Sequence, residues 1–297
     1  MPKLAYVSEL VEEVHAKTIL NRHKRRDPWF LDEYSINPYG SCDFGCVYCY
    51  IHGGKYGSRK LVVKINAPEL LSRELSRLAR RGKYGIIALG SATEPWMHID
   101  KRYQLTRKCL EIIARFRFPI HCLTKSTLIL RDIDVLKDID ENAILPSDLK
   151  EKLNHGVLIT FSFSTLDKRI AKIFEPFAPS PDERLNTIQR LKDEGFFVGI
   201  AFMPLLPYIS DSTHDLEAMV KTARDIGVDY VFFGNLTLDM EGKKIFFRVL
   251  ERNFPSLVRK YEKLYGNKNL PIRTYVDSLY RRAYAISRKH GVRIGIT

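Results

Sequence analysis

The sequence has 297 residues, of which 45% are hydrophobic and 28% are charged. This length and balance are typical of a soluble globular protein with one large domain or two small ones. No apolar run reaches the ~18–20 residues that cross a bilayer, and the first residues lack a signal-peptide pattern. We therefore exclude a membrane partner and expect a cytoplasmic protein.

The net charge is +13, from 48 Lys and Arg against 35 Asp and Glu. A basic surface attracts phosphate backbones and favours DNA or RNA as a partner. The same excess, spread over solvated helix faces, is typical of proteins from hot environments, and both interpretations stay open here. The densest basic clusters are at 22–26, at 77–83, and at 281–282 with 288–290.

Short apolar runs alternate with segments of helical period along the chain. The first half predicts a strand at 34–39, a strand at 61–65, a helix at 68–81, a strand at 85–90, a helix at 102–116, a strand at 120–124 and a short helix at 131–139. The second half predicts a strand at 157–163, a helix at 181–194, a strand at 197–203, a helix at 213–226 and a strand at 230–233. Gly195 and Gly227 are expected to end the last two helices.

Strands and helices that alternate in this way pair in parallel through right-handed crossovers. About six βα units fit before residue 235, so we predict an α/β fold, a partial (β/α)6 barrel of the TIM type. We place a basic N-terminal arm at 1–32, the barrel at 33–235 and a mostly helical extension at 236–297. Sites in such folds form at the carboxyl ends of strands. The segments expected to meet there are 42–49, 91–94, 124–126, 162–165 and 204–207.

Three of the five cysteines, Cys42, Cys46 and Cys49, lie in one C-x3-C-x2-C loop. An odd number of cysteines in a chain expected in the cytosol argues against a disulfide framework and for metal binding. Thiolates are soft ligands that suit iron–sulfur clusters and zinc. Three of them on a tight loop can hold three corners of a 4Fe–4S cube and leave the fourth iron open to a small molecule.

Zinc is the competing interpretation, with His52 as a fourth ligand. Zinc sites of this kind usually stabilise small domains that cannot fold alone. Here nearly 250 residues of βα pattern follow the loop and need no such support. The spacing therefore favours an iron–sulfur cluster.

At these residues the sequence resembles the radical S-adenosylmethionine (radical SAM) superfamily, whose motif has an aromatic residue, here Tyr48, before the last cysteine. Further motifs resemble the group related to spore photoproduct lyase, often labelled DNA repair photolyase. They lie at 37–42, 49–50, 91–95, 124–126, 130–134, 174–181 and 184–185. The similarity covers roughly residues 15–235.

The resemblance implies two cofactors, a 4Fe–4S cluster and S-adenosyl-L-methionine (SAM), and an electron donor of the flavodoxin or ferredoxin type. The reduced cluster would cleave SAM to a 5′-deoxyadenosyl radical, which abstracts hydrogen from the substrate. A nucleic-acid base is the expected substrate. The alternatives are a radical SAM enzyme that acts on a protein, peptide or small molecule, and a metal-containing nucleic-acid-binding protein without catalysis.

The resemblance also implies roles for single residues. Cys42, Cys46 and Cys49 would bind the cluster, and Tyr50 would help return the hydrogen atom. The residues expected to contact SAM are Tyr48, Ser91, Thr93, Lys125 and Ser162. The alternatives from the residues alone are a solvated strand-end lysine for Lys125 and a packing residue beside the cluster for Tyr50. Glu94 is either a further contact to the amino group of SAM or an exposed loop carboxylate. Glu175 and Arg184 are interpreted as structural.

One feature departs from the family pattern. Photoproduct lyases carry a hydrogen-donating cysteine in the loop where this chain has Gly90, Ser91 and Ala92. Cys109 and Cys122 fall inside a predicted helix and strand, where we expect them to be buried packing residues. Cleavage of a thymine dimer by the lyase route is therefore not expected.

Overall fold

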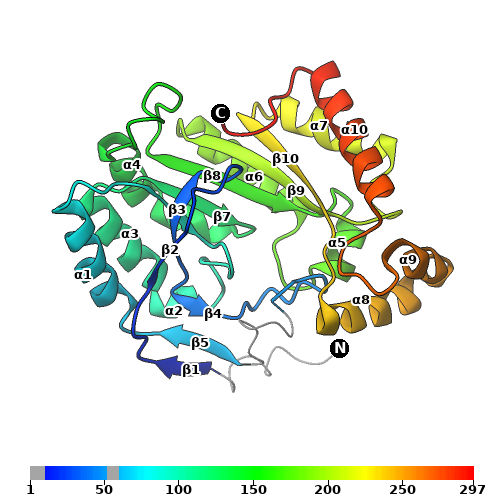
Figure 1. Ribbon diagram of the computed structural model, residues 1–297, viewed down its shortest axis with the longest axis horizontal. Coiled ribbons are helices and arrows are strands. Elements are labelled where there is room, and N and C mark those ends of the chain that lie inside the picture. Colours follow the sequence, from blue (N-terminus) through cyan, green and yellow to red (C-terminus); the bar gives the residue numbers. More distant parts are fainter. Residues whose placement is uncertain (1–10, 52–59) are drawn as a thin grey trace.

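The computed structural model describes residues 11–51 and 60–297. Its main sheet holds six parallel strands whose spatial order is their chain order (Figure 1). They are β3 (Asp32–Ile36), β6 (Ile86–Leu89), β7 (Ile120–Thr124), β8 (Val157–Phe163), β9 (Phe197–Leu205) and β10 (Tyr230–Asn235). The antiparallel strand β2 (Leu20–Arg22) adds to the β3 edge. The predicted partial barrel of six βα units is confirmed.

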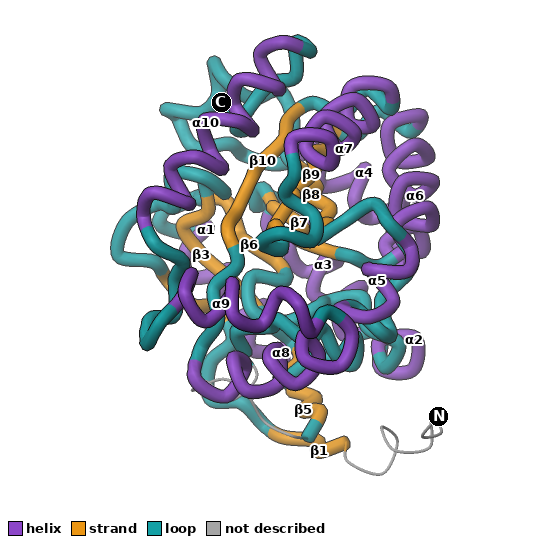
Figure 2. Tube along the Cα trace, turned by 90° about the vertical axis from the view of Figure 1, so that its right-hand side faces the viewer, coloured by secondary structure: helices purple, strands orange, loops and turns teal. Residues whose placement is uncertain are grey.

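Helices cover the outer face of this sheet (Figure 2). They are α1 (Ala67–Ala79), α3 (Leu105–Phe116), α4 (Ile133–Asn142), α6 (Pro181–Asp193) and α7 (Thr213–Asp225). Strand side chains alternate between two cores, as a pleated strand requires. On β7, Ile120 and Cys122 pack outward in the helix-covered core. On β8 and β10, Leu158 and Tyr230 belong to a second, inner core.

Local sequence signals fix the ends of two helices. Ser180 and Glu183 form a reciprocal capping box at the start of α6, and Ser212 and Asp215 form one at the start of α7. Each box satisfies main-chain amides that have no partner within the helix. Gly195 and Gly227 follow these helices with φ of +87° and +71°, as the sequence predicted.

The predicted strand at 34–39 is divided between two sheets. β3 ends at Ile36, and β4 (Tyr39–Gly40) joins a small sheet with β5 (Leu61–Lys64) and β1 (Val11–Val14). Pro38 separates the two strands, and its lack of an N–H group prevents a continuous ladder. Because β1 and β2 lie within 1–32, the described part of the predicted basic arm contributes to both sheets.

Two predicted helices begin differently in the structure. The segment at 102–116 is broken at Gln104, whose φ is +53°, into α2 (Asp100–Tyr103) and α3. Buried Asp100 stabilises the break by accepting a hydrogen bond from the Thr106 amide (3.0 Å). The helix at 131–139 becomes a 3₁₀ turn, Thr127–Asp132, followed by α4. The seven-residue helix α5 (Lys168–Phe174) was not predicted, because it is too short to show a period.

The C-terminal region is mostly helical, as predicted, with α8 (Met240–Asn253), α9 (Val258–Tyr265) and α10 (Arg273–Lys289). α8 and α9 share a hydrophobic cluster with Val47 and Tyr48 of the cysteine loop. α10 packs on α7 and β10, with Leu279 and Ile286 buried. Among the described residues, no helix has the length and apolar character of a membrane span.

Candidate active site

Hydrogen bonds join the carboxyl ends of four neighbouring strands. After β6, the Glu94 carboxylate accepts from the Thr124 hydroxyl (2.6 Å) and the Lys125 amide (2.8 Å) at the end of β7. Lys125 Nζ donates to Ser162 Oγ on β8 (2.8 Å). Ser162 donates to the Met203 carbonyl on β9 (2.8 Å). The strand ends therefore form one polar site, in the place that the predicted fold indicated.

Lys125 and Ser162 are well placed to hold an anionic group. The Lys125 ammonium lies 6.0 Å from the centroid of the Tyr48 ring, and its charge also acts on Cys46. A lysine supplies a point charge that suits a carboxylate, and the Ser162 hydroxyl can donate to the same group if it turns away from the Met203 carbonyl. The structure brings these two predicted cofactor contacts together beside the cysteine loop.

The cysteine loop, residues 42–49, is attached to the segment that follows α5. The Val47 amide donates to the Phe174 carbonyl (2.8 Å), and the Phe177 amide donates to the Phe44 carbonyl (3.2 Å). These two main-chain hydrogen bonds run in opposite directions, as in a short antiparallel pair. They fix the loop against the region after β8.

The three thiols of the loop are partly buried and influence one another. Burial raises the pKa of Cys42, and the charge of Cys46 raises it further. Burial raises the pKa of Cys46 to about 12, although Lys125 acts in the opposite direction. A bound cation reverses this balance because it binds the thiolate form.

The chemistry of the donors fits an iron–sulfur cluster. Three soft thiols on one loop match the ligands that such clusters take. Over 11–51 and 60–297, no three His, Cys, Asp or Glu side chains converge as the ligands of a single ion would. A four-iron cube holds its thiolates further apart and does not require that convergence. His52, the candidate fourth zinc ligand, lies outside the described residues.

A buried network of charged and polar side chains packs against the cysteine loop and stabilises it. Glu175 accepts hydrogen bonds from the hydroxyl groups of Tyr48 and Ser164 and from the Arg184 guanidinium. Burial alone would raise the pKa of Glu175, but the positive charges of Arg184 and Lys125 hold it below its ordinary value. The Tyr48 hydroxyl is therefore engaged in the network.

Asn37 organises the loop after β6. Its Oδ1 accepts hydrogen bonds from the amides of Ala92 (3.2 Å) and Thr93 (3.3 Å). Its Nδ2 donates to Ser91 Oγ (3.4 Å). The Tyr50 hydroxyl donates to the Ser91 carbonyl (2.6 Å), while 54% of Tyr50 is exposed. The structure thus joins Tyr50, Ser91 and Thr93 at one edge of the site.

The structure decides between the two interpretations of Glu94. It is not an exposed loop carboxylate, because it is buried and bonded to Thr124, Lys125 and the Trp96 amide. The Thr93 hydroxyl is also buried and donates to the Tyr39 carbonyl (3.3 Å). Asn37 was not predicted as a site residue, although its place before the cysteine loop was a usable signal.

Cys109 and Cys122 are buried, as expected, in α3 and β7. Both face the core between the sheet and its helices. They are packing residues and stand apart from the cysteine loop.

Comparisons with known proteins agree with this geometry. The sequence model of the radical SAM superfamily matches residues 36–223. An uncharacterized protein of Mycobacterium tuberculosis is 25% identical over 266 residues, which cover 86% of this chain and 74% of the relative. A "radical SAM Nalpha-GlyT isomerase" of a Pseudomonas phage is 24% identical over 93% of this chain and 55% of its own length.

A solved structure of a spore photoproduct lyase variant has the same fold. It superposes with a TM-score of 0.70 over 96% of this chain and 81% of the lyase, at 15% identity. The family match covers more than half of the chain, and the fold is the one that the family uses. The protein therefore belongs to the radical SAM superfamily, whose enzymes use a 4Fe–4S cluster and S-adenosylmethionine.

Proposed function

We propose that this radical SAM enzyme acts on a nucleic-acid base. The observation that supports this most directly is the shared fold with spore photoproduct lyase, which has also been solved with a dinucleoside spore photoproduct. The net charge of +13 points to the same class of substrate, because phosphate backbones bind basic surfaces. The loop after β6 has no cysteine, so we do not expect the lyase route of thymine-dimer cleavage.

In this proposal, Cys42, Cys46 and Cys49 hold three irons of the cluster. Lys125 and Ser162 receive the carboxylate of SAM, and the loop from Ser91 to Thr93 receives its amino group. When bound, the two cofactors supply hydrogen-atom abstraction from an unactivated C–H bond. Tyr50, with its ring exposed at the edge of the site, faces the substrate and returns hydrogen.

Reconstitution with iron and sulfide under exclusion of oxygen tests the cluster. We expect a 4Fe–4S spectrum and, with dithionite and SAM, formation of 5′-deoxyadenosine. Cys46→Ala should lose the iron while keeping the circular dichroism spectrum, because the loop lies outside the main core. Cys109→Ala is the matched control and should keep the iron. Retention of zinc in place of iron would overturn this assignment.

A second measurement tests the substrate class. DNA or RNA should raise the output of 5′-deoxyadenosine, and their binding should weaken steeply with salt. A salt slope near zero, or stimulation by a peptide or metabolite alone, would count against a nucleic-acid substrate.

A further inference from the structure

One face of α1 carries a row of cations that form no ion pair within the part of the chain that the structure describes. Arg73, Arg77 and Arg80 lie four and three residues apart, so they share one side of the helix, and all are exposed. Arg81 and Lys83 continue the row just after α1. Over the described ranges 11–51 and 60–297, no carboxylate forms an ion pair with any of the five. We call these five residues the α1 basic row.

The other two basic clusters of the sequence are different, because carboxylates neutralise part of each. In the first, His23 contacts Asp32 (2.9 Å) and Arg26 contacts Glu33 (2.6 Å). In the second, Glu217 lies 2.9 Å from Lys289 and 3.0 Å from His290. Basic composition alone therefore does not explain why the α1 basic row lacks partners.

Like charges four residues apart on a helix repel each other and destabilise it. Arg73 and Arg77 form such a pair, and Arg80 adds a third charge. The fold gains no ion pair in return among the described residues. An external anion is what would offset this cost.

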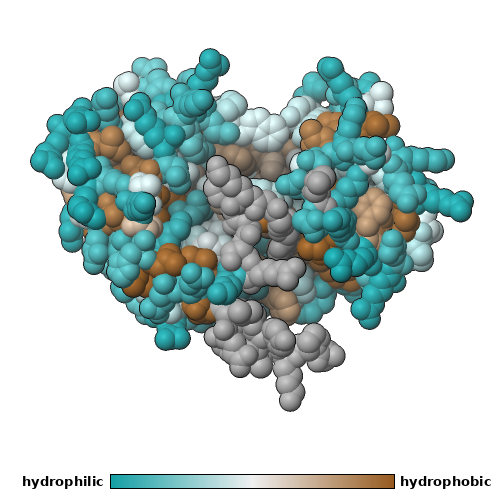
Figure 3. Space-filling view, turned by 60° about the horizontal axis from the view of Figure 1, so that its bottom comes forward, coloured by the Kyte–Doolittle hydropathy of each residue, from teal (hydrophilic) through white to brown (hydrophobic). Residues whose placement is uncertain are grey.

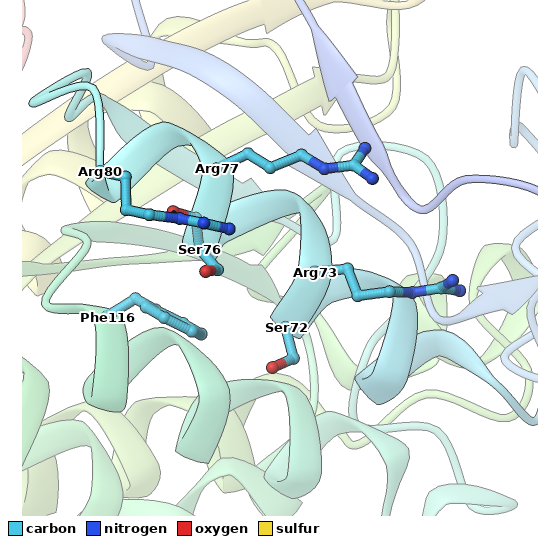
Figure 4. A pocket seen from close by; sticks show the side chains of 6 residues that line it. All are labelled: Ser72, Arg73, Ser76, Arg77, Arg80 and Phe116. Carbon is cyan, nitrogen blue, oxygen red and sulfur yellow. Dashed lines mark hydrogen bonds between the residues drawn. The ribbon is translucent and has the colours of Figure 1, made fainter.

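Three residues of the row, Arg73, Arg77 and Arg80, line a pocket whose other groups suit a nucleic acid. Ser72, Ser76 and Phe116 complete the lining, and the volume is about 300 Å³. Figure 4 shows Arg73 and Arg77 extending the same way from α1, while Phe116 approaches from α3. Guanidinium forks and serine hydroxyls bind phosphate oxygens, and an aromatic ring stacks on bases.

The length of the α1 basic row indicates that its ligand is a polyanion. Arg80 is seven positions after Arg73, which is about 10 Å along a helix axis. That distance exceeds a single phosphate group and suits successive phosphates of a strand. Arginine predominates over lysine in the row, which favours phosphate recognition.

Electron donors are acidic proteins in many redox pairs, so one could also bind a basic surface. The position of the α1 basic row argues against the electron donor as its partner. α1 leads into β6, so its C-terminal half lies where the strands begin. The cysteine loop lies at the other end of the sheet, where the strands finish. In Figure 1, α1 is on the left side of the molecule, whereas α8 and α9, which pack against the cysteine loop, are on the right. A reductant would dock close to the cluster.

We propose that the α1 basic row is a docking surface for the phosphate backbone of a nucleic acid, separate from the active site. The inference deepens the proposed function and rests on it for the role of the bound strand. Figure 3 shows a hollow between two sides of the molecule with hydrophobic residues inside it. A nucleic-acid strand held on α1, outside this hollow, would be anchored there. One of its bases would be presented at the carboxyl ends of the β-strands.

The test compares two triple variants of the reconstituted enzyme. The first is Arg73→Gln, Arg77→Gln and Arg80→Gln. The control is Lys150→Gln, Lys152→Gln and Arg190→Gln, which removes the same charge from exposed positions on other elements. Anisotropy of a labelled mixed-sequence DNA or RNA, single-stranded or duplex, is measured across salt concentrations, with circular dichroism as the check of folding.

We expect the α1 variant to bind at least tenfold more weakly than the control. Its slope of log affinity against log salt should fall by about 2 to 3, since each lost phosphate contact removes about 0.7–0.9. Production of 5′-deoxyadenosine without nucleic acid should not change. Equal losses in both variants would mean that only net charge matters and would overturn the proposal.

The remaining outcomes separate this proposal from the proposed function. If the α1 variant binds like the wild type while nucleic acid still raises 5′-deoxyadenosine output, the docking surface is wrong and the function stands. If binding is lost but no nucleic acid ever raises that output, the docking surface stands and the function is wrong. If the α1 variant loses only reduction by flavodoxin, the surface binds a protein and the proposal is overturned.

Discussion

Glu175 and Arg184 form an ion pair beside the cysteine loop with about 1% of each side chain exposed. The pair is wholly desolvated, so its stability depends on both partners. Because Glu175 also accepts from Tyr48, it links the pair to the residue directly before Cys49. Glu175 and Arg184, which the sequence analysis interpreted as structural residues, thus support the loop that is proposed to hold the cluster.

Removing only one partner of the ion pair should strongly destabilise the protein. Arg184→Met leaves the Glu175 carboxylate buried without its cation, and we expect a loss of about 3–5 kcal/mol in the free energy of unfolding. Urea unfolding of the apoprotein measures this. The double variant Glu175→Gln with Arg184→Met removes both charges and should be more stable than Arg184→Met alone. Additive losses would contradict a coupled pair.

Gly45 should be required for the cysteine loop in a way that another glycine is not. Its φ is +61°, and an added Cβ would lie 3.0 Å from the Phe177 ring. Gly82 has nearly the same φ, +62°, but a Cβ there would meet nothing within 4 Å. Both substitutions to alanine should cost about 1–2 kcal/mol from the left-handed backbone.

Only Gly45→Ala should lower the iron-to-protein ratio after reconstitution, because only it pushes the loop away from Phe177. Iron analysis of the two variants side by side is the measurement. Equal iron contents would mean that the contact with Phe177 does not position the loop.

Lys125 should matter for SAM more than for the cluster. Lys125→Met removes the charge that faces Ser162 Oγ, and a charge-assisted hydrogen bond is worth about 1.5–3 kcal/mol. We expect SAM to bind roughly 10- to 100-fold more weakly by equilibrium dialysis, with an unchanged cluster spectrum. Ser162→Ala, which keeps the charge, should have a smaller effect. If Lys125→Met bound SAM as tightly as the wild type does, Lys125 would be an ordinary solvated lysine at a strand end without a role in SAM binding.

The sequence predicted what depends on local pattern. Alternating apolar and helical segments indicated the six parallel strands, and the helices predicted to start at 181 and 213 start there in the structure. The spacing of the cysteines and the strand-end position of Lys125 indicated where the site would form. These signals are contained in short windows of the chain.

What the sequence missed depends on contacts between distant residues. Glu94 stayed undecided between a site residue and an exposed loop residue because its partner Thr124 is 30 positions away. The break at Gln104 depends on Asp100 being buried against Tyr39, 61 positions earlier. The α1 basic row looked like the other basic clusters until the ion pairs of the others were visible.

His121 should make the protein less stable in mild acid. It lies wholly buried in β7, where its ring contacts the Phe30 carbonyl (2.9 Å) and Thr160 Oγ1 (2.6 Å). Burial lowers its pKa to about 4, although the Phe30 carbonyl and the Asp27 charge oppose this. Between pH 4 and the ordinary value near 6.5, the unfolded chain binds the proton and the folded chain does not. Stability therefore falls as the pH falls through this window.

Urea unfolding at pH 7.5 and pH 5 measures the effect, which for this residue amounts to about 2 kcal/mol. His121→Gln is the matched variant, because an amide can still donate and accept but does not titrate in this range. The variant should lose less stability than the wild type between the two pH values, by about that amount. The same pH dependence in both proteins would mean that His121 is protonated in the folded protein. The imidazolium ring of His121 would then donate a hydrogen bond to Thr160.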